Sequence, residues 1–290
     1  MKISLYEKAK KLRFHAVLLS TLLKSGRFHR EFRMRGLSFD SIRDYIPGDD
    51  IRFIDWNATA RFGKPYVKEF VEDSNVPIML VIDVSASVTV VKNFFEKIQE
   101  CALLLLYAGM HQQIPVGLTL FGMQKTDVAP QGVIFIKPEV SRANYHRIEK
   151  LLLSCNANAS GISNINDALF YVNKRVHPGT LVFILSDYYF SGYKEKIAML
   201  MLLHTVIGIR FLHARNEYPN CVLHSQDAES GNNYLLLANK SYSDNAVKER
   251  TMHIESELYA IFNSGFLLEI LQEHDVFTHL ANFLKERTLR

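Results

Sequence analysis

From residue 76 onward, apolar runs of strand length alternate with helix-length segments for more than 200 residues. A strand that is buried on both faces of a parallel sheet reads as a short continuous apolar run. The run from Val76 to Ile82 is of this kind and is rich in β-branched residues. Because such runs alternate with helices, the sequence predicts an α/β fold with a doubly wound, mostly parallel sheet.

The expected elements follow from apolar periodicity and turn residues. The expected strands are residues 78–83, 116–121, 133–136, 181–186, 205–212 and 266–270. The expected helices are residues 90–110, 142–153, 164–175, 193–203, 244–263 and 276–287. Two further short strands, 221–224 and 234–237, flank Gly-Asn-Asn and predict a β-hairpin inserted near 221–237.

Residues 1–75 predict a separate N-terminal part, followed by one α/β domain over residues 76–290. We expect a helix over residues 4–25, then an irregular segment with a short strand near Tyr66–Val71. Residues 1–35 hold ten Lys and Arg against two Glu, a balance of +8, so the rest of the +4 chain is net −4. This basic arm, residues 1–35, could bind an acidic protein, a membrane surface or nucleic acid, although a solvated helix face is the more ordinary interpretation.

A carboxylate and two hydroxyls directly follow the first strand, at Asp83, Ser85 and Ser87. In an extended segment, residues two apart project from the same side, so these three oxygens face the same way. Hard oxygen ligands suit a magnesium-like cation. The sequence therefore predicts a divalent-ion site at the carboxyl end of this strand. An ion at such a site can bind a carboxylate of a partner protein without catalysing a reaction.

A second expected strand also ends in an acid, Asp187, and a hydroxyl-bearing loop places Ser163 just before a helix. In open α/β sheets, ligands bind beyond the carboxyl ends of the strands, where the strand order reverses. We therefore expect Asp83, Ser85, Ser87, Ser163 and Asp187 to hold Mg²⁺, or Mn²⁺ or Ca²⁺, with a position open to water or a partner's carboxylate. Taken singly, Ser163 can simply cap a helix and Asp187 can begin a turn.

Other functional classes lack their motifs in this sequence. There is no GxxxxGK[ST] phosphate loop, no HExxH pair and no GxSxG nucleophile elbow. Three widely spaced cysteines favour a reducing compartment, and no apolar stretch is long enough to cross a bilayer, so we expect a cytoplasmic protein. We expect no enzyme activity. A metal-dependent hydrolase or phosphatase at the same acids is the alternative, as is nucleic-acid or membrane binding through the basic arm.

Asp83-x-Ser85-x-Ser87, together with Ser163 and Asp187, resembles the metal-ion-dependent adhesion site of von Willebrand factor A domains. The resemblance implies a von Willebrand A-like fold and gives these five residues the role of metal ligands. The third ligand of that family is normally Thr, whereas this chain has Ser163.

The stretch from Arg35 to Arg61 is similar to the signature of the bacterial "domain of unknown function 58" family, which places it before a von Willebrand A-like domain. Members of that family are usually associated with MoxR-type AAA+ ATPases. The resemblance implies an adaptor for such an ATPase or its client, acting in protein-complex assembly, metal insertion or stress response.

The arginines of this signature alternate with aspartates. Buried Arg–carboxylate pairs would lock the segment against the sheet, and Trp56, the only tryptophan, is expected to pack as an anchor. If the segment instead contacts a partner, Arg43, Arg52 and Arg61 are the candidate binding residues.

Overall fold

The computed structural model describes most of the chain from residue 39 onward and five residues before it. The described residues are 15–16, 18–20, 39–51, 54–70, 76–85, 88, 92–123, 129, 131–155, 165–189, 192–212, 222–226, 233–237, 252–262, 266–271 and 273–289.

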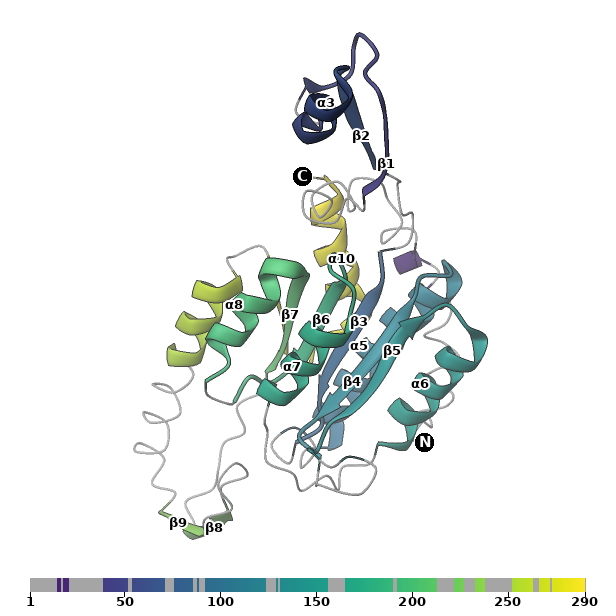
Figure 1. The fold of residues 1–290 in the computed structure, drawn as a ribbon. Coiled ribbons are helices and arrows are strands. Elements are labelled where there is room, and N and C mark those ends of the chain that lie inside the picture. The colour runs from purple at the N-terminus through teal and green to yellow at the C-terminus, as the bar shows by residue number, and fades with distance from the viewer. Residues whose placement is uncertain are drawn as a thin grey trace.

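A six-stranded sheet forms the centre of the fold (Figure 1). Its strands are β3 (Ile78–Asp83), β4 (Val116–Phe121), β5 (Ile134–Glu139), β6 (Leu181–Ser186), β7 (Thr205–Leu212) and β10 (Leu267–Leu271). The spatial order is β10-β7-β6-β3-β4-β5, and every neighbouring pair is parallel except β4 with the edge strand β5. Counted along the chain, this is the 3-2-1-4-5-6 order of a doubly wound sheet. The chain order therefore reverses between β3 and β6.

Helices cover both faces of the sheet and make a three-layer α/β/α domain (Figure 1). One face carries α5 (Lys92–His111), α6 (Arg142–Ser154) and α10 (Val276–Leu289), and the other carries α7 (Ile165–Arg175), α8 (Lys194–Leu203) and a helix at residues 252–262. Alternate strand residues enter the two cores, so Leu80 and Ile82 face one while Met79 and Val81 face the other. Both faces are buried, which is why the strands are continuous apolar runs.

The predicted fold class is confirmed by this topology, and four strands have the expected bounds: β3, β4, β6 and β7. The edge strand β5 is longer than expected and runs through Pro138 to Glu139. Proline is tolerated there because an edge strand has one side without ladder bonds. Of the helix expected at 244–263, only residues 252–262 lie in the described part of the chain.

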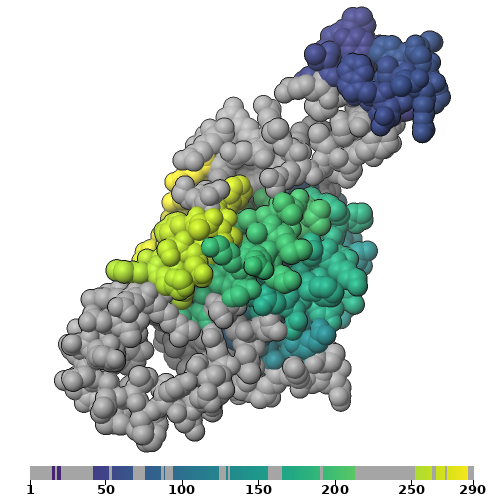
Figure 2. Space-filling view, turned by 60° about the vertical axis from the view of Figure 1, so that its left-hand side comes forward, coloured from purple at the N-terminus to yellow at the C-terminus, as the bar shows by residue number. Residues whose placement is uncertain are grey.

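Two small units accompany the central sheet. An N-terminal unit consists of the antiparallel ribbon β1 (Phe39–Asp44) and β2 (Tyr66–Phe70) with the short helix α3 (Trp56–Phe62), and Figure 1 and Figure 2 both show it standing away from the sheet. The predicted hairpin is present as β8 (Val222–Gln226) and β9 (Asn233–Leu237). Of the predicted helix over 4–25, residues 15–16 and 18–20 are helical, with Ala16 and Leu19 buried. The proposed boundary at residue 75 falls outside the described residues and stays a prediction.

Candidate functional site

Asp83 and Asp187 lie on the two strands between which the chain order reverses. Asp83 is the last residue of β3, and Asp187 directly follows β6. Since β3 and β6 are parallel neighbours, with Ile82 opposite Leu185, their carboxyl ends bring the two acids to the same edge. Both side chains are buried, with at most 2% exposed. This is the position at which doubly wound sheets bind ligands, as the sequence predicts.

The hydroxyl of Ser186 lies between the two carboxylates. Ser186 Oγ donates to Asp83 Oδ2 at 2.8 Å and lies 3.4 Å from Asp187 Oδ1. The same oxygen accepts a 2.9 Å hydrogen bond from the backbone N–H of Tyr188. Ser186 thus links the ends of β3 and β6 and fixes the position of one oxygen of Asp83.

The backbone after β6 turns sharply around Asp187. The N–H of Tyr189 donates to Asp187 Oδ1 at 3.0 Å, and Tyr188 has a φ of 60°, in the left-handed region that a bulky residue rarely adopts. The Tyr188 ring is fully buried against Tyr193 and Phe262, with ring centroids 6.1 Å apart in both pairs. Its hydroxyl donates to the carbonyl of Ile184 at 3.0 Å. Packing of this ring therefore holds the strained turn that follows Asp187.

The loop after β3 is held by backbone contacts. The N–H of Ser85 donates to Asp83 Oδ1 at 2.9 Å, and the N–H of Val84 donates to the carbonyl of Phe121 on β4 at 2.9 Å. Gly122 has a φ of +82°, and a Cβ there would meet Ser85 backbone and side-chain atoms at 2.8–2.9 Å. Only glycine gives this close approach without strain. The sequence after β4 therefore helps to place Ser85.

Burial and mutual repulsion set the electrostatics of this pair. Removal of Asp83 from water raises its pKa, and the nearby charge of Asp187 raises it further, while the hydrogen bonds from Ser85 and Ser186 oppose the shift. A carboxyl group in this position is costly to ionise unless a positive charge lies beside it.

The donors present fit a hard divalent cation. The carboxylates of Asp83 and Asp187 and the side chain of Ser85 lie at this edge of the sheet. A cation between the two acids would offset the repulsion that raises the Asp83 pKa. Of the five predicted ligands, the structure brings together Asp83, Ser85 and Asp187, whereas Ser87 and Ser163 lie outside the described residues. Among the described residues there is no group of three or more His, Cys, Asp or Glu side chains arranged around a metal position.

Sequence reasoning missed a buried arginine, Arg210, which lies beside Ser186 on the neighbouring strand. Arg210 on β7 is in register with Ser186 on β6 and with Glu269 on β10. Its side chain is fully buried, and its Nη1 lies 3.0 Å from Glu269 Oε1 and 3.7 Å from Glu255 Oε1. Arg210 therefore ties the helix at 252–262 to the sheet beside the site. Its only sequence signal is one charge inside an apolar strand.

Ser186 was also missed, because sequence reasoning treated it only as the last residue of a core strand. The available signal was a hydroxyl immediately before an acid at the carboxyl end of a parallel strand.

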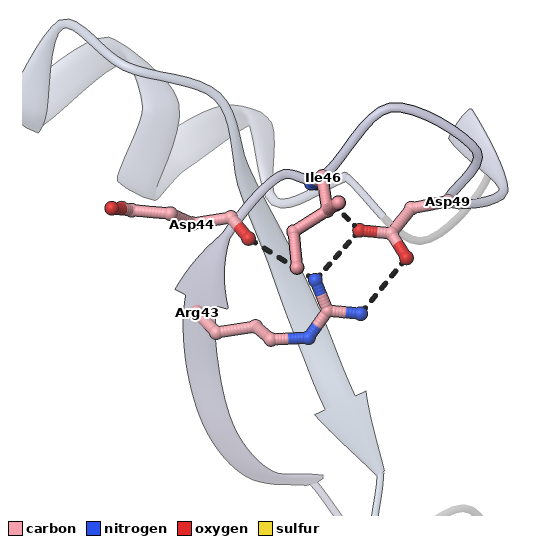
Figure 3. Close-up of polar contacts among 4 residues, drawn as sticks. All are labelled: Arg43, Asp44, Ile46 and Asp49. Atoms are coloured by element: carbon pink, nitrogen blue, oxygen red, sulfur yellow. Dashed lines mark hydrogen bonds and ion pairs between the residues drawn. The ribbon is translucent and has the colours of Figure 1, made fainter.

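Among the described residues of the Arg/Asp-rich segment, Arg43 and Asp49 form an ion pair (Figure 3). Arg43 Nη1 and Nη2 donate to the two carboxylate oxygens of Asp49 at 2.6 and 2.9 Å, and the N–H of Ile46 donates to Asp49 Oδ2 at 2.9 Å. These bonds lower the pKa of Asp49 to about 2. The Arg43–Asp49 pair is partly exposed and closes the turn after β1. The expectation of a buried Arg–carboxylate pair against the main sheet is therefore wrong for this pair. Arg61 is exposed in the last turn of α3, and Arg52 lies outside the described residues.

The expectation that Trp56 packs as an anchor is wrong, since this residue is 69% exposed. It begins α3, a helix of seven residues whose one buried residue is Ala58. A two-stranded ribbon and a two-turn helix have no further layer to form a core around an indole. Ile46, Ile51 and Phe62 are similarly exposed on this unit.

Within the described part of the chain, no helix combines the length and the apolar character needed to cross a membrane.

The fold and the site define a doubly wound α/β domain with paired buried carboxylates at its switch point. The family model described as "Protein of unknown function DUF58" matches residues 41–253, more than half of the sequence, and the chain belongs to this family. Two curated relatives are "Uncharacterized protein Rv1480" of Mycobacterium tuberculosis (strain ATCC 25618 / H37Rv) and "Uncharacterized protein Mb1516" of Mycobacterium bovis. Each is 47% identical over 45 residues, which is 16% of this chain and only 14% of the relative's length.

Two solved structures are similar at low identity. Proximal thread matrix protein 1 from the mussel byssus has a TM-score of 0.44 and 15% identity, covering 74% of this chain and 46% of that one. The open conformation of the pilus adhesin SpaC from Lactobacillus rhamnosus GG has a TM-score of 0.40 and 14% identity, covering 74% of this chain and 30% of that one. Likenesses of this strength establish nothing about the site.

Proposed function

We propose that this protein is a non-catalytic binding module that holds a divalent ion, Mg²⁺ in the first instance, at the edge between β3 and β6. The ligands would be Asp83 and Asp187 with the hydroxyls of Ser85, Ser87 and Ser163. When bound, the ion supplies an electrophilic position that accepts a carboxylate from a partner protein. The observation that carries the proposal is the buried pair Asp83 and Asp187, linked by the Ser186 hydroxyl at the switch point.

The chain's own residues keep the proposed site rigid. Ser186 and the N–H of Ser85 each bond one oxygen of Asp83, and the N–H of Tyr189 bonds Asp187. Two carboxylates balance the charge of a divalent ion without a surplus that would repel an incoming acid. Side chains so fixed need little reorganisation on binding, which favours affinity.

The proposed partner is a MoxR-type AAA+ ATPase or its client, and the proposed process is protein-complex assembly, metal insertion or stress response. Membership of the family supports this proposal through the resemblance described above. We also propose a cytoplasmic location, which the free thiols of Cys101 and Cys155 support.

A second candidate function, metal-dependent hydrolysis at the same edge, is favoured by one observation. A carboxyl group whose pKa is raised by burial and a like charge can act as a general base or acid near neutral pH. We favour binding because the hydrogen bonds described above, from the Ser186 hydroxyl and from the backbone N–H groups of Ser85 and Tyr189, orient the two acids as ligands. Turnover of a phosphoester that is lost in Asp187→Asn would favour the second candidate.

The proposed function is tested by co-precipitation with a purified MoxR-type ATPase in Mg²⁺ and in EDTA. Wild type and Asp83→Asn are compared, since the carboxamide keeps the size of the side chain but removes its charge. We expect retention of the ATPase by wild type in Mg²⁺ alone. Equal retention by both proteins in EDTA would place the interaction elsewhere on the chain.

A further inference from the structure

A surface hollow of about 550 Å³ runs beside helix α7. It is lined by Gln131, Asp167, Phe170, Tyr171, Lys174 and Arg175. Five of these residues lie on α7 at spacings of three, four, seven and eight, so they share one face of the helix. The ring of Tyr171 stacks on Phe135 of the edge strand β5, with centroids 6.4 Å apart. The groove therefore lies where α7 meets the open edge of the sheet.

Two cations lie over aromatic rings in this groove. The guanidinium carbon of Arg175 is 4.8 Å from the Tyr171 ring and 5.8 Å from the Phe135 ring. Lys174 Nζ is 5.5 Å from the Phe170 ring. A cation–π contact engages the face of a guanidinium and leaves its N–H groups available to an anion, and Arg175 is exposed. In the described part of the chain, neither Lys174 nor Arg175 pairs with a carboxylate.

The groove also exposes apolar surface. Phe170 is 60% exposed, although it is a large aromatic residue that lines the hollow. The one acid in the lining, Asp167, lies in the first turn of α7, whereas both cations lie in the last turn. Eight residues of helix separate Asp167 from Arg175 by about 12 Å. The cationic end of the groove is therefore locally positive and aromatic.

We propose that this groove binds an acidic segment of a partner protein, in which a carboxylate lies next to an apolar side chain. The carboxylate pairs with the N–H groups of Arg175 and with Lys174, and the apolar side chain packs on Phe170. Charge complementarity selects the acid, because the two cations at this end are balanced by no nearby acid of the lining. A guanidinium already fixed on two rings loses little freedom when it binds, which makes it a suitable anchor.

Cations among aromatic rings are also found in single-stranded nucleic-acid sites. In this groove, however, the Tyr171 ring is already covered by Phe135 and by the Arg175 guanidinium, so of the two lining rings Phe170 alone offers an exposed face to a base. Two positive charges form no row that could follow a phosphate backbone, and residues 36–290 are net −4. These observations favour an acidic peptide over nucleic acid.

The proposal is independent of the proposed ion site, because no residue of the groove belongs to the predicted ligand set. Peptide binding at α7 is therefore expected in EDTA as well as in Mg²⁺. A failure of the metal proposal leaves this surface unaffected, and the reverse also holds.

Fluorescence anisotropy of a labelled peptide, in which glutamates alternate with phenylalanines, tests the proposal on the full chain. The double variant Lys174→Gln/Arg175→Gln removes both cations, and Arg147→Gln/Lys150→Gln on the exposed face of α6 is the control with the same change in net charge. We expect the first to weaken binding at least tenfold and the control to change it less than twofold. Phe170→Ser should also weaken binding, whereas Leu202→Ser, which is 71% exposed on α8, should not.

Four results would overturn the proposal. These are no binding of the peptide to wild type, equal losses in the two double variants, equal affinity for a peptide with glutamine in place of glutamate, or loss of binding in EDTA. Tighter binding of labelled oligothymidine, again sensitive to Lys174 and Arg175, would reassign the groove to nucleic acid. Thermal unfolding of each variant shows that it is folded under the assay conditions.

Discussion

Ser186 Oγ donates a 2.8 Å hydrogen bond to Oδ2 of Asp83, across 103 residues of sequence and between two parallel strands. The same hydroxyl accepts from the N–H of Tyr188. It therefore couples the end of β3 to the turn that carries Asp187.

Ser186→Ala is expected to lower the free energy of unfolding by about 1–3 kcal/mol, because it removes partners from two buried polar groups. Chemical denaturation measures this change. Thr119→Val is a matched control on the same sheet, since the buried Thr119 hydroxyl has no hydrogen-bond partner in the described structure. That variant should be neutral or stabilising, and an equal loss in the two variants would contradict the bridging role of Ser186.

Gly122→Ala is expected to displace Ser85 and weaken divalent-ion binding. A Cβ at Gly122 meets Ser85 at 2.8 Å, in addition to about 1–2 kcal/mol of strain from the positive φ. Gly63→Ala is the control, because Gly63 has a φ of +71° but nothing within 4 Å of the place that a methyl group would take. Both variants should lose stability, but only Gly122→Ala should lose affinity in a magnesium titration. Unchanged affinity in Gly122→Ala would mean that Ser85 is not a ligand.

The raised pKa of Asp83 predicts a pH-dependent difference between wild type and Asp83→Asn in EDTA. Folded Asp83 retains its proton above the pKa of an unfolded aspartate, about 3.9, so the folded state binds more protons in that range. The contribution of Asp83 to stability therefore falls as the pH rises from about 4 through the raised folded pKa. Asp83→Asn, which mimics the neutral acid, should become increasingly more stable than wild type over this range.

Denaturation of both proteins between about pH 5 and about pH 8 measures that difference. A constant difference in unfolding free energy would show that Asp83 titrates normally.

The exposure of Trp56 predicts its fluorescence. As the only tryptophan, it should emit at long wavelength and be quenched freely by acrylamide. Trp56→Ala should change the unfolding free energy by no more than about 0.5 kcal/mol. By contrast, truncation of the fully buried Phe183 to Ala should cost about 3–5 kcal/mol. Blue-shifted, protected emission from Trp56 would restore the interpretation as an anchor.

The sequence was sufficient where burial on both faces of the sheet leaves a continuous apolar run. The bounds of β3 and β6 follow from such runs, and the acids that end them point to the switch edge. Strand order itself depends on contacts between distant segments, which periodicity does not contain.

The errors have local causes. Helix α3 was missed because seven residues give too little periodicity to detect, although Asp55 caps it by accepting from the N–H groups of Asn57 and Ala58. Trp56 was misassigned because an apolar residue was assumed to find a core. Ser186 and Arg210 were overlooked because both stand inside core strands, where only the neighbouring strand reveals their partners.

The central claim is that Asp83 and Asp187 hold a divalent ion. Its most direct test is a magnesium titration by calorimetry and thermal unfolding, with wild type, Asp83→Asn and the control Glu195→Gln, an exposed residue in the first turn of α8, side by side. We expect saturable binding by wild type and Glu195→Gln, with stabilisation of about 2.7 kcal/mol at one hundred times the dissociation constant, and no response from Asp83→Asn. No binding by wild type, or the same response from Asp83→Asn, would contradict the account.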